Sequence, residues 1–222
     1  MSFNVAVDGP AGAGKSTIAR AVAKKMNLIY VDTGALYRAM ALFMLKEGVS
    51  LDDRKGIAQK CLQADITIRY EDGEQVVVLN GENVNAFLRT EEVGNAASAV
   101  SPVPEVRKKL VELQKRLAAQ SDCIMDGRDI GTCVLPEAQL KIYLTASSAV
   151  RAKRRYDELA AKGEPCDLEK IRADIEERDY RDMHREVSPL RQAEDAVLLD
   201  TSDMGVDEVI SHILGLCRER RG

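Results

Sequence analysis

A glycine-rich segment near the N-terminus, GPAGAGKS from Gly9 to Ser16, constrains the fold more than any other part of the chain. It follows the apolar run FNVAVD and precedes KSTIARAVAKKM, whose apolar residues recur at helical spacing. The segment matches G-x-x-x-x-G-K-[ST], in which glycines let consecutive backbone N–H groups turn toward phosphate oxygens. The N-terminus of the following helix adds positive potential at the same place. The segment therefore predicts a phosphate-binding loop for a nucleoside triphosphate, between a strand and a helix.

The residue types in this loop have distinct predicted roles. Lys15 is expected to reach the β- and γ-phosphates, and the Ser16 hydroxyl to ligate Mg²⁺. Asp126 ends a later apolar run and could support the same ion. The predicted nucleotide-binding residues are Gly9, Pro10, Ala11, Gly12, Ala13, Gly14, Lys15, Ser16 and Thr17.

Five short apolar runs predict the strands of one sheet. They are FNVAVD, LIYVD, CIMD, LKIYLTA and AVLLD. Most are nearly continuous rather than alternating, which is typical of parallel strands covered on both faces. Helical patterns at 15–26, 104–120, 147–163 and 206–220 separate or follow them. The pattern predicts an α/β fold of three layers around a five-stranded parallel sheet.

One segment, residues 65–85, breaks this pattern. DITIRYEDGEQVVVLNGENVN alternates apolar and polar residues and has turn signals at Asp72-Gly73 and Asn80-Gly81. It predicts a small antiparallel hairpin or three-stranded unit. Because it lies between the second and third core strands, we expect an insertion that stands out from the core.

Composition limits the classes of partner. The 222 residues are 45% hydrophobic and 31% charged with a net charge of -4, so one core and no nucleic-acid partner are expected. No apolar run approaches the ~20 residues of a membrane helix, and the first residues lack a signal-peptide pattern. The five cysteines are scattered, which favours reduced thiols in the cytoplasm over zinc or disulfides.

Clustered arginines predict a second anion site. In RDYRDMHREVSPLR, from Arg178 to Arg191, charges occupy positions where the apolar stripe of the preceding helical pattern would continue. A solvated helix end is the alternative interpretation. Further arginines follow the second and third strands in DTGALYR and DGRDIGT. Because arginine binds phosphate through a planar fork, two or three that converge would indicate a second phosphate-bearing substrate.

Another basic segment, VRAKRRYDELAAKG, contains Arg151 and Arg154 on a predicted helix before a loop with glycine and proline. This arrangement resembles a mobile lid that brings positive charge over a transferring phosphoryl group. For the neighbouring Arg155, a solvated helix face is preferred.

Together, DGPAGAGKST, DTGALYR, NAASAVSPVPEVR, DGRDIGT and RDYRDMHREVSPL resemble the bacterial cytidylate kinase family, in order from about Val5 to about Thr201. The resemblance implies phosphoryl transfer from ATP, with Mg²⁺, to CMP or dCMP. It also implies a core domain (1–38, 98–150 and 176–222), a nucleoside-monophosphate-binding domain with the β insertion (39–97) and a lid (151–175). Small-molecule nucleotides are the expected partners, without nucleic acid or membrane, and a monomer is expected.

The resemblance also implies residue roles. Arg38, Arg128 and Arg185 would hold the CMP phosphate; Ser98, Arg107 and Asp129 would recognise cytosine; Arg178 and Asp182 would hold the sugar; Thr33 and Tyr37 would line the pocket. Lys15, Arg128, Arg151 and Arg154 would form the catalytic set. A carboxylate can accept a hydrogen bond from cytosine N4, whereas UMP would present a carbonyl oxygen there. Another small acceptor, such as UMP or a shikimate-like acid, and a nucleotide-gated switch are the alternatives.

Overall fold

A five-stranded parallel sheet organises the chain in the computed structural model, which describes residues 2–221. The strand order is β2-β6-β1-β7-β8. The strands are β1 (Asn4–Asp8), β2 (Ile29–Asp32), β6 (Cys123–Gly127), β7 (Leu140–Thr145) and β8 (Val197–Asp200). In the parallel ladders, Val5 lies opposite Leu140 and Ile142 opposite Val197. The predicted fold class and all five predicted strands are confirmed.

The chain divides into two compact units. One, called the loop unit below, consists of residues 3–28 and 124–221. The other, called the insertion unit, consists mainly of residues 29–123.

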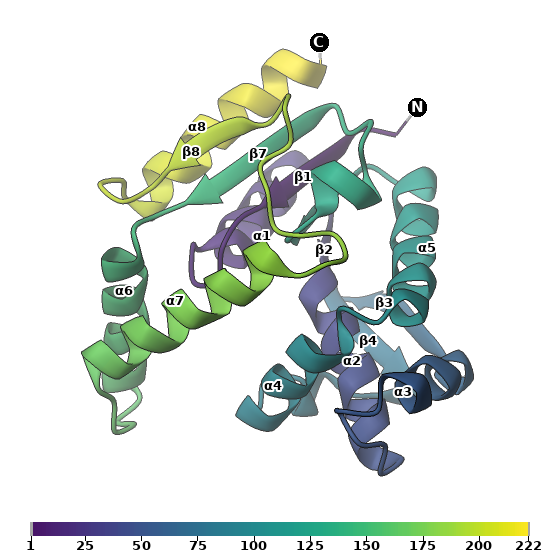
Figure 1. Ribbon diagram of the computed structural model, residues 1–222. Helices are drawn as coiled ribbons and strands as arrows, with labels where there is room; N and C mark the ends of the chain where they lie inside the picture. Colours follow the sequence, from purple (N-terminus) through teal and green to yellow (C-terminus); the bar gives the residue numbers. More distant parts are fainter. Residues whose placement is uncertain (1, 222) are drawn as a thin grey trace. The chain divides into compact units, whose positions relative to one another are not determined.

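In the loop unit, helices pack around β1, which precedes the glycine-rich segment, and around the later strands β7 and β8 (Figure 1). The elements are α1 (Lys15–Met26), the single-turn π-helix η3 (Ile130–Val134), α6 (Ser148–Ala161), α7 (Leu168–His184) and α8 (Val206–Arg221). Helix α1 buries Ile18, Ala19 and Val22, and it ends where Asn27 adopts a left-handed conformation with φ 53°. Helix α1 packs against α8, and α6 packs against α7.

In the insertion unit, an apolar helix packs against a small antiparallel sheet (Figure 1). The elements are α2 (Thr33–Lys46), α3 (Arg54–Lys60), η1 (Cys61–Gln63), β3 (Ile66–Glu71), β4 (Glu74–Leu79), β5 (Glu82–Asn83), η2 (Asn85–Phe87), α4 (Glu91–Val100) and α5 (Pro104–Gln120). The sheet has the order β3-β4-β5. Its two turns fall at the predicted Asp72-Gly73 and Asn80-Gly81 pairs, all four residues having positive φ. The predicted three-stranded unit is confirmed.

The core of the insertion unit lies between α2, the small sheet and helices α4 and α5. Leu36, Met40 and Met44 of α2 are fully buried there, together with Val77 and Leu110. Among the residues that the structure describes, no helix combines the length and the apolar character needed to cross a membrane.

Candidate nucleotide-binding site

The glycine-rich loop adopts the backbone conformations that phosphate binding requires. Gly9, Gly12 and Gly14 have φ values of 148°, 74° and 87°, which L-residues with a side chain rarely adopt. At Gly9 a Cβ atom would also collide with the carbonyl oxygen of Leu144. Backbone N–H groups in such a curled loop, next to the N-terminus of α1, form an anion-binding concavity.

Lys15 lies inside this concavity, with 6% of its surface exposed. Its Nζ donates a hydrogen bond to the Pro10 carbonyl oxygen at 2.7 Å. Burial, followed by the positive charge of Arg128, lowers the pKa of Lys15 to about 7, although Asp126 and Asp8 act in the opposite direction. A triphosphate in the loop would supply the anionic partner that favours the charged amine.

The Ser16 hydroxyl and the Asp126 carboxylate lie next to each other, at the start of α1 and near the end of β6. The Ser16 hydroxyl donates to Asp126 Oδ2 at 2.8 Å, and Asp126 is buried. Within residues 2–221 no group of three or more histidine, cysteine or acidic side chains could hold a metal. Two protein oxygens fit Mg²⁺, which usually keeps several waters and also binds substrate phosphates.

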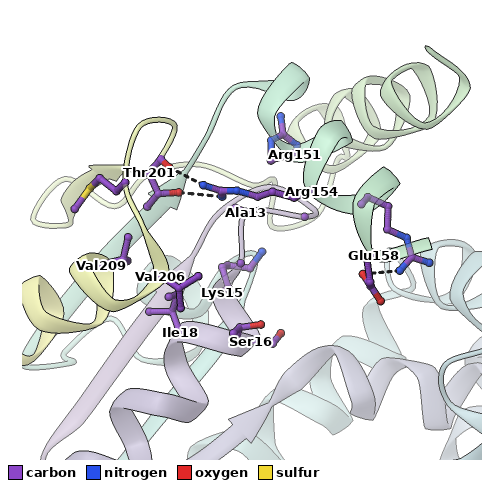
Figure 2. A pocket seen from close by; sticks show the side chains of 15 residues that line it. Ala13, Lys15, Ser16, Ile18, Arg151, Arg154, Glu158, Thr201, Val206 and Val209 are labelled. Atoms are coloured by element: carbon purple, nitrogen blue, oxygen red, sulfur yellow. Dashed lines mark hydrogen bonds and ion pairs between the residues drawn. The ribbon is translucent and has the colours of Figure 1, made fainter. Parts of the chain in front are cut away.

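A cavity of about 380 Å³ opens beside the loop, in the loop unit (Figure 2). Arg154 reaches across it to Thr201, donating to the carbonyl oxygen at 2.7 Å and to Oγ1 at 3.3 Å. Ile18, Val206 and Val209 line an apolar side. The cavity therefore offers a phosphate cradle and an apolar surface suited to a flat base.

Arg151 is buried against the loop rather than extended into solvent. Its Nε donates to the Ala146 carbonyl oxygen at 2.8 Å, and Nη1 donates to the Ala11 carbonyl oxygen at 2.9 Å. Nη1 also lies 2.7 Å from Asp179 Oδ2. The Ala11 N–H donates to the other oxygen of Asp179 at 3.3 Å. Arg151 and Asp179 thus tie α6 and α7 to the phosphate loop.

The sequence pattern does not identify Asp179 as a site residue. The expected inward residue of α7 was Arg178, but Arg178 is exposed and Asp179 is buried. Either one continues the stripe from Ile175, since residues three and four positions along a helix share a face. Spacing alone could not choose between them.

The structure brings several predicted acceptor-site residues of the loop unit together. Arg128 Nε pairs with Asp182 Oδ2 at 2.7 Å, which helps to lower the pKa of Asp182 although burial opposes this effect. Arg185 lies just beyond the end of α7, where Nη2 is 3.5 Å from Asp129 Oδ1. Nε of Arg185 donates to the Ser188 carbonyl oxygen at 2.6 Å. Two arginines and two carboxylates therefore form a charged cluster of low exposure.

Asp8 holds the turn that carries part of this cluster. Its two carboxylate oxygens accept hydrogen bonds from the N–H groups of Ile130 at 2.8 Å and Gly131 at 2.7 Å. Burial raises the pKa of Asp8 to about 6, although the two backbone donors lower it. The turn directly follows Arg128 and Asp129.

The insertion unit places the other predicted acceptor-site residues on α2, α4 and α5. Thr33 begins α2 and is buried, and the Arg107 guanidinium lies 5.8 Å from the ring centre of Tyr37. Ser98 is half-buried, and its hydroxyl donates to the Gly94 carbonyl oxygen at 3.4 Å. Arg38 pairs with Asp32 at 2.9 Å. The predicted roles of these residues stay predictions.

The parallel sheet and the curled glycine loop define a nucleotide-binding protein of the P-loop class. The model of the family described as "Cytidylate kinase" matches residues 5–219. Proteins named cytidylate kinase from Lactobacillus johnsonii, Caldicellulosiruptor bescii and Streptococcus sanguinis are 48%, 49% and 50% identical to this chain. The alignments cover 99%, 96% and 95% of this chain and 95%, 95% and 94% of those proteins. The chain therefore belongs to the cytidylate kinase family.

Solved structures share the fold at low sequence identity. TT1252 from Thermus thermophilus has a TM-score of 0.50 and 18% identity, with 100% of this chain and 98% of that chain covered. An uncharacterized protein from Eubacterium ventriosum has a TM-score of 0.53 and 13% identity, with 99% of each chain covered. These similarities concern the fold alone.

Proposed function

We propose that the protein transfers the γ-phosphoryl group of ATP to CMP or dCMP, giving ADP and CDP or dCDP. The observation that carries the proposal is a complete phosphate loop in a chain that also holds a second, separate set of arginines with low exposure. Its family membership agrees with this reaction. A second phosphate-bearing substrate explains arginines that a single triphosphate would not need.

On the donor side, Lys15 binds the β- and γ-phosphates and stabilises charge on the transferring group. Ser16 and Asp126 would hold Mg²⁺, which would neutralise negative charge that develops on the phosphates. Arg154, in the proposed lid 151–175, is available to turn from Thr201 toward the phosphates. Arg151 stays in the proposed catalytic set with Arg154, and it also supports the phosphate loop through its hydrogen bond to the Ala11 carbonyl oxygen.

On the acceptor side, Arg38, Arg128 and Arg185 hold the CMP phosphate. Asp129 accepts from the cytosine amino group, which UMP lacks, and Ser98 and Arg107 donate to the ring acceptors. Arg178 and Asp182 hold the sugar hydroxyls, and Thr33 and Tyr37 line the pocket.

The chemistry needs positioning and electrostatic stabilisation rather than a covalent enzyme intermediate. An anionic oxygen of the CMP phosphate attacks the γ-phosphorus, and the bond between that phosphorus and the bridging β–γ oxygen breaks. ADP leaves with the bonding electrons. Because the attacking oxygen is already ionised, no strong general base is required.

An acceptor panel tests the proposal. Coupled assays of ADP formation should show turnover that depends on CMP or dCMP and is much weaker with UMP, AMP, shikimate or gluconate. A preference for shikimate or gluconate would contradict the proposal, and slow hydrolysis independent of every acceptor would instead favour a nucleotide-gated switch. The monomeric state, the cytoplasmic location and the three-part domain division remain predictions.

A further inference from the structure

The β2 strand presents part of its backbone at an edge of the five-stranded sheet. In a strand, the backbone N–H and C=O groups of successive residues point to opposite sides, so alternate residues share a side. The Ile29 N–H donates to the Asp122 carbonyl oxygen, just before β6, so Ile29 faces the neighbouring strand. Tyr30 and Asp32 then direct their backbone groups to the other, open side of β2.

Two side chains of the β insertion satisfy these backbone groups. The Tyr70 hydroxyl donates to the Tyr30 carbonyl oxygen at 3.0 Å. Gln75 Oε1 accepts from the Asp32 N–H at 2.7 Å, and Gln75 Nε2 donates to the Asp32 carbonyl oxygen at 3.3 Å. Tyr70 and Gln75 are directly opposite each other in the β3–β4 ladder. One cross-strand pair of the insertion therefore covers three backbone groups of β2.

The side chain of Asp32 links this contact to Arg38. Asp32 Oδ1 accepts from the Ala35 N–H at 2.9 Å and caps α2. Asp32 Oδ2 pairs with Arg38 Nη2 at 2.9 Å. With the backbone of Asp32 held at both its N–H and its C=O, its carboxylate is fixed between the helix terminus and the arginine.

Arg38 retains a donor for a ligand. Its Nε atom is buried and has no hydrogen-bond partner among the described residues, while Asp32 occupies Nη2. A buried donor without a partner is unfavourable unless something fills the position. An oxygen of an anionic ligand would do so, and the orientation of the fork relative to that ligand depends on Asp32.

We propose that Gln75 of the β insertion is a positioning residue for the acceptor phosphate, acting through Asp32 on Arg38. This inference rests on the proposed role of Arg38 in binding CMP. The insertion then has a function in the reaction: its hairpin sets the orientation of one phosphate-binding arginine on α2. Misplacement of such a group by about 1 Å can weaken catalysis strongly.

The test compares Gln75→Met with Gln63→Met, an exposed glutamine of the same unit. Methionine approximates the length of glutamine but cannot hydrogen-bond to Asp32. We expect Gln75→Met to raise the KM for CMP about five- to tenfold, the effect of losing one to two neutral hydrogen bonds, with the KM for ATP within about twofold of wild type. Gln63→Met should match wild type. Equal changes in both KM values, or none, would overturn the proposal.

A double variant separates this inference from the proposed function. If Gln75 acts through Arg38, Gln75→Met should add less than about twofold to the CMP KM in an Arg38→Ala background. An Arg38→Ala variant with an unchanged CMP KM would instead refute the role of Arg38 itself. A full additional five- to tenfold effect in that background would show that Gln75 acts by another route and overturn the inference alone.

A second substitution separates a loss of stability from a loss of Arg38 positioning. If Gln75→Met lowers Tm by more than a few degrees, Gln75→Glu provides the same readout with a polar side chain. Its carboxylate can accept from the Asp32 N–H but cannot donate to the Asp32 carbonyl oxygen. A raised CMP KM with an unchanged ATP KM is again expected, and a wild-type CMP KM would contradict the proposal.

Discussion

Arg151 and Asp179 form a buried ion pair behind the phosphate loop, with 2.7 Å between Nη1 and Oδ2. Both residues also hydrogen-bond to the backbone of Ala11, Arg151 to its carbonyl oxygen and Asp179 to its N–H. The pair therefore binds both backbone polar groups of Ala11 and fixes the position of this residue in the loop. Loop geometry thus depends on charges in two helices far along the chain.

Removal of one partner should strongly destabilise the protein. We expect Asp179→Ala to lower the free energy of unfolding by about 3–5 kcal/mol, because the Arg151 charge would remain buried without its carboxylate. Asp174→Ala, at an exposed position of the same helix, should change it by less than about 0.5 kcal/mol. Urea unfolding measures both. Similar values for the two variants would show that the ion pair contributes little.

Lys15→Ala should affect turnover much more than acceptor binding. Loss of a preorganised charge at the transferring phosphoryl group lowers kcat by about 10²–10³-fold, by analogy with removal of an oxyanion donor. The KM for CMP should change by less than about threefold. Lys24→Ala, exposed on the same helix, serves as the control. Unchanged turnover in Lys15→Ala would refute the assigned role.

The lowered pKa of Lys15 predicts proton uptake when ATP binds. Because burial and the charge of Arg128 lower this pKa toward neutrality in the free protein, the neutral amine is populated at pH 8. The triphosphate favours the charged form and raises this pKa, so ATP affinity should fall as pH rises from 7 to 9. Calorimetry at pH 8 in two buffers of different ionisation enthalpy measures the protons taken up. Binding heats that are independent of the buffer would contradict the prediction.

Asp129→Asn should reduce discrimination between CMP and UMP. An amide can donate to the UMP carbonyl oxygen, whereas the carboxylate repels it. We expect the ratio of kcat/KM for CMP to that for UMP to fall by at least about tenfold, consistent with one base contact worth about 1–3 kcal/mol. Kinetics with both acceptors measure the ratio, and an unchanged ratio would assign base recognition to other residues.

Helices and strands were predictable from the sequence where the spacing of apolar residues matches the face that is buried in the structure. Helices α1 and α5 match the predicted ranges 15–26 and 104–120 because their apolar residues keep helical spacing, and Pro104 suits a first turn. The strands were recognisable as apolar runs because both of their faces are covered. Glycine turns in the insertion were recognisable because they require positive φ.

The contacts that orient site residues were not predictable. Gln75 meets Asp32 across 43 positions of sequence, and Asp179 meets Ala11 across 168. Such contacts depend on how elements pack, which no local pattern encodes. The exposure of Arg178 differs from expectation for a related reason: helical periodicity identifies a face about 100° wide but not which of two neighbouring residues is buried.

The side-chain cover over β2 has a consequence for attempts to shorten the protein. Deletion of the β3–β4 hairpin would remove the hydrogen bonds that Tyr70 makes to the Tyr30 carbonyl and that Gln75 makes to both backbone polar groups of Asp32. A bare strand edge is a template on which another chain can add a strand. A minimal P-loop core made in this way should therefore aggregate through β2, unless a charged residue or proline is introduced into that strand. The insertion therefore also protects the β2 edge from pairing with a strand of another chain.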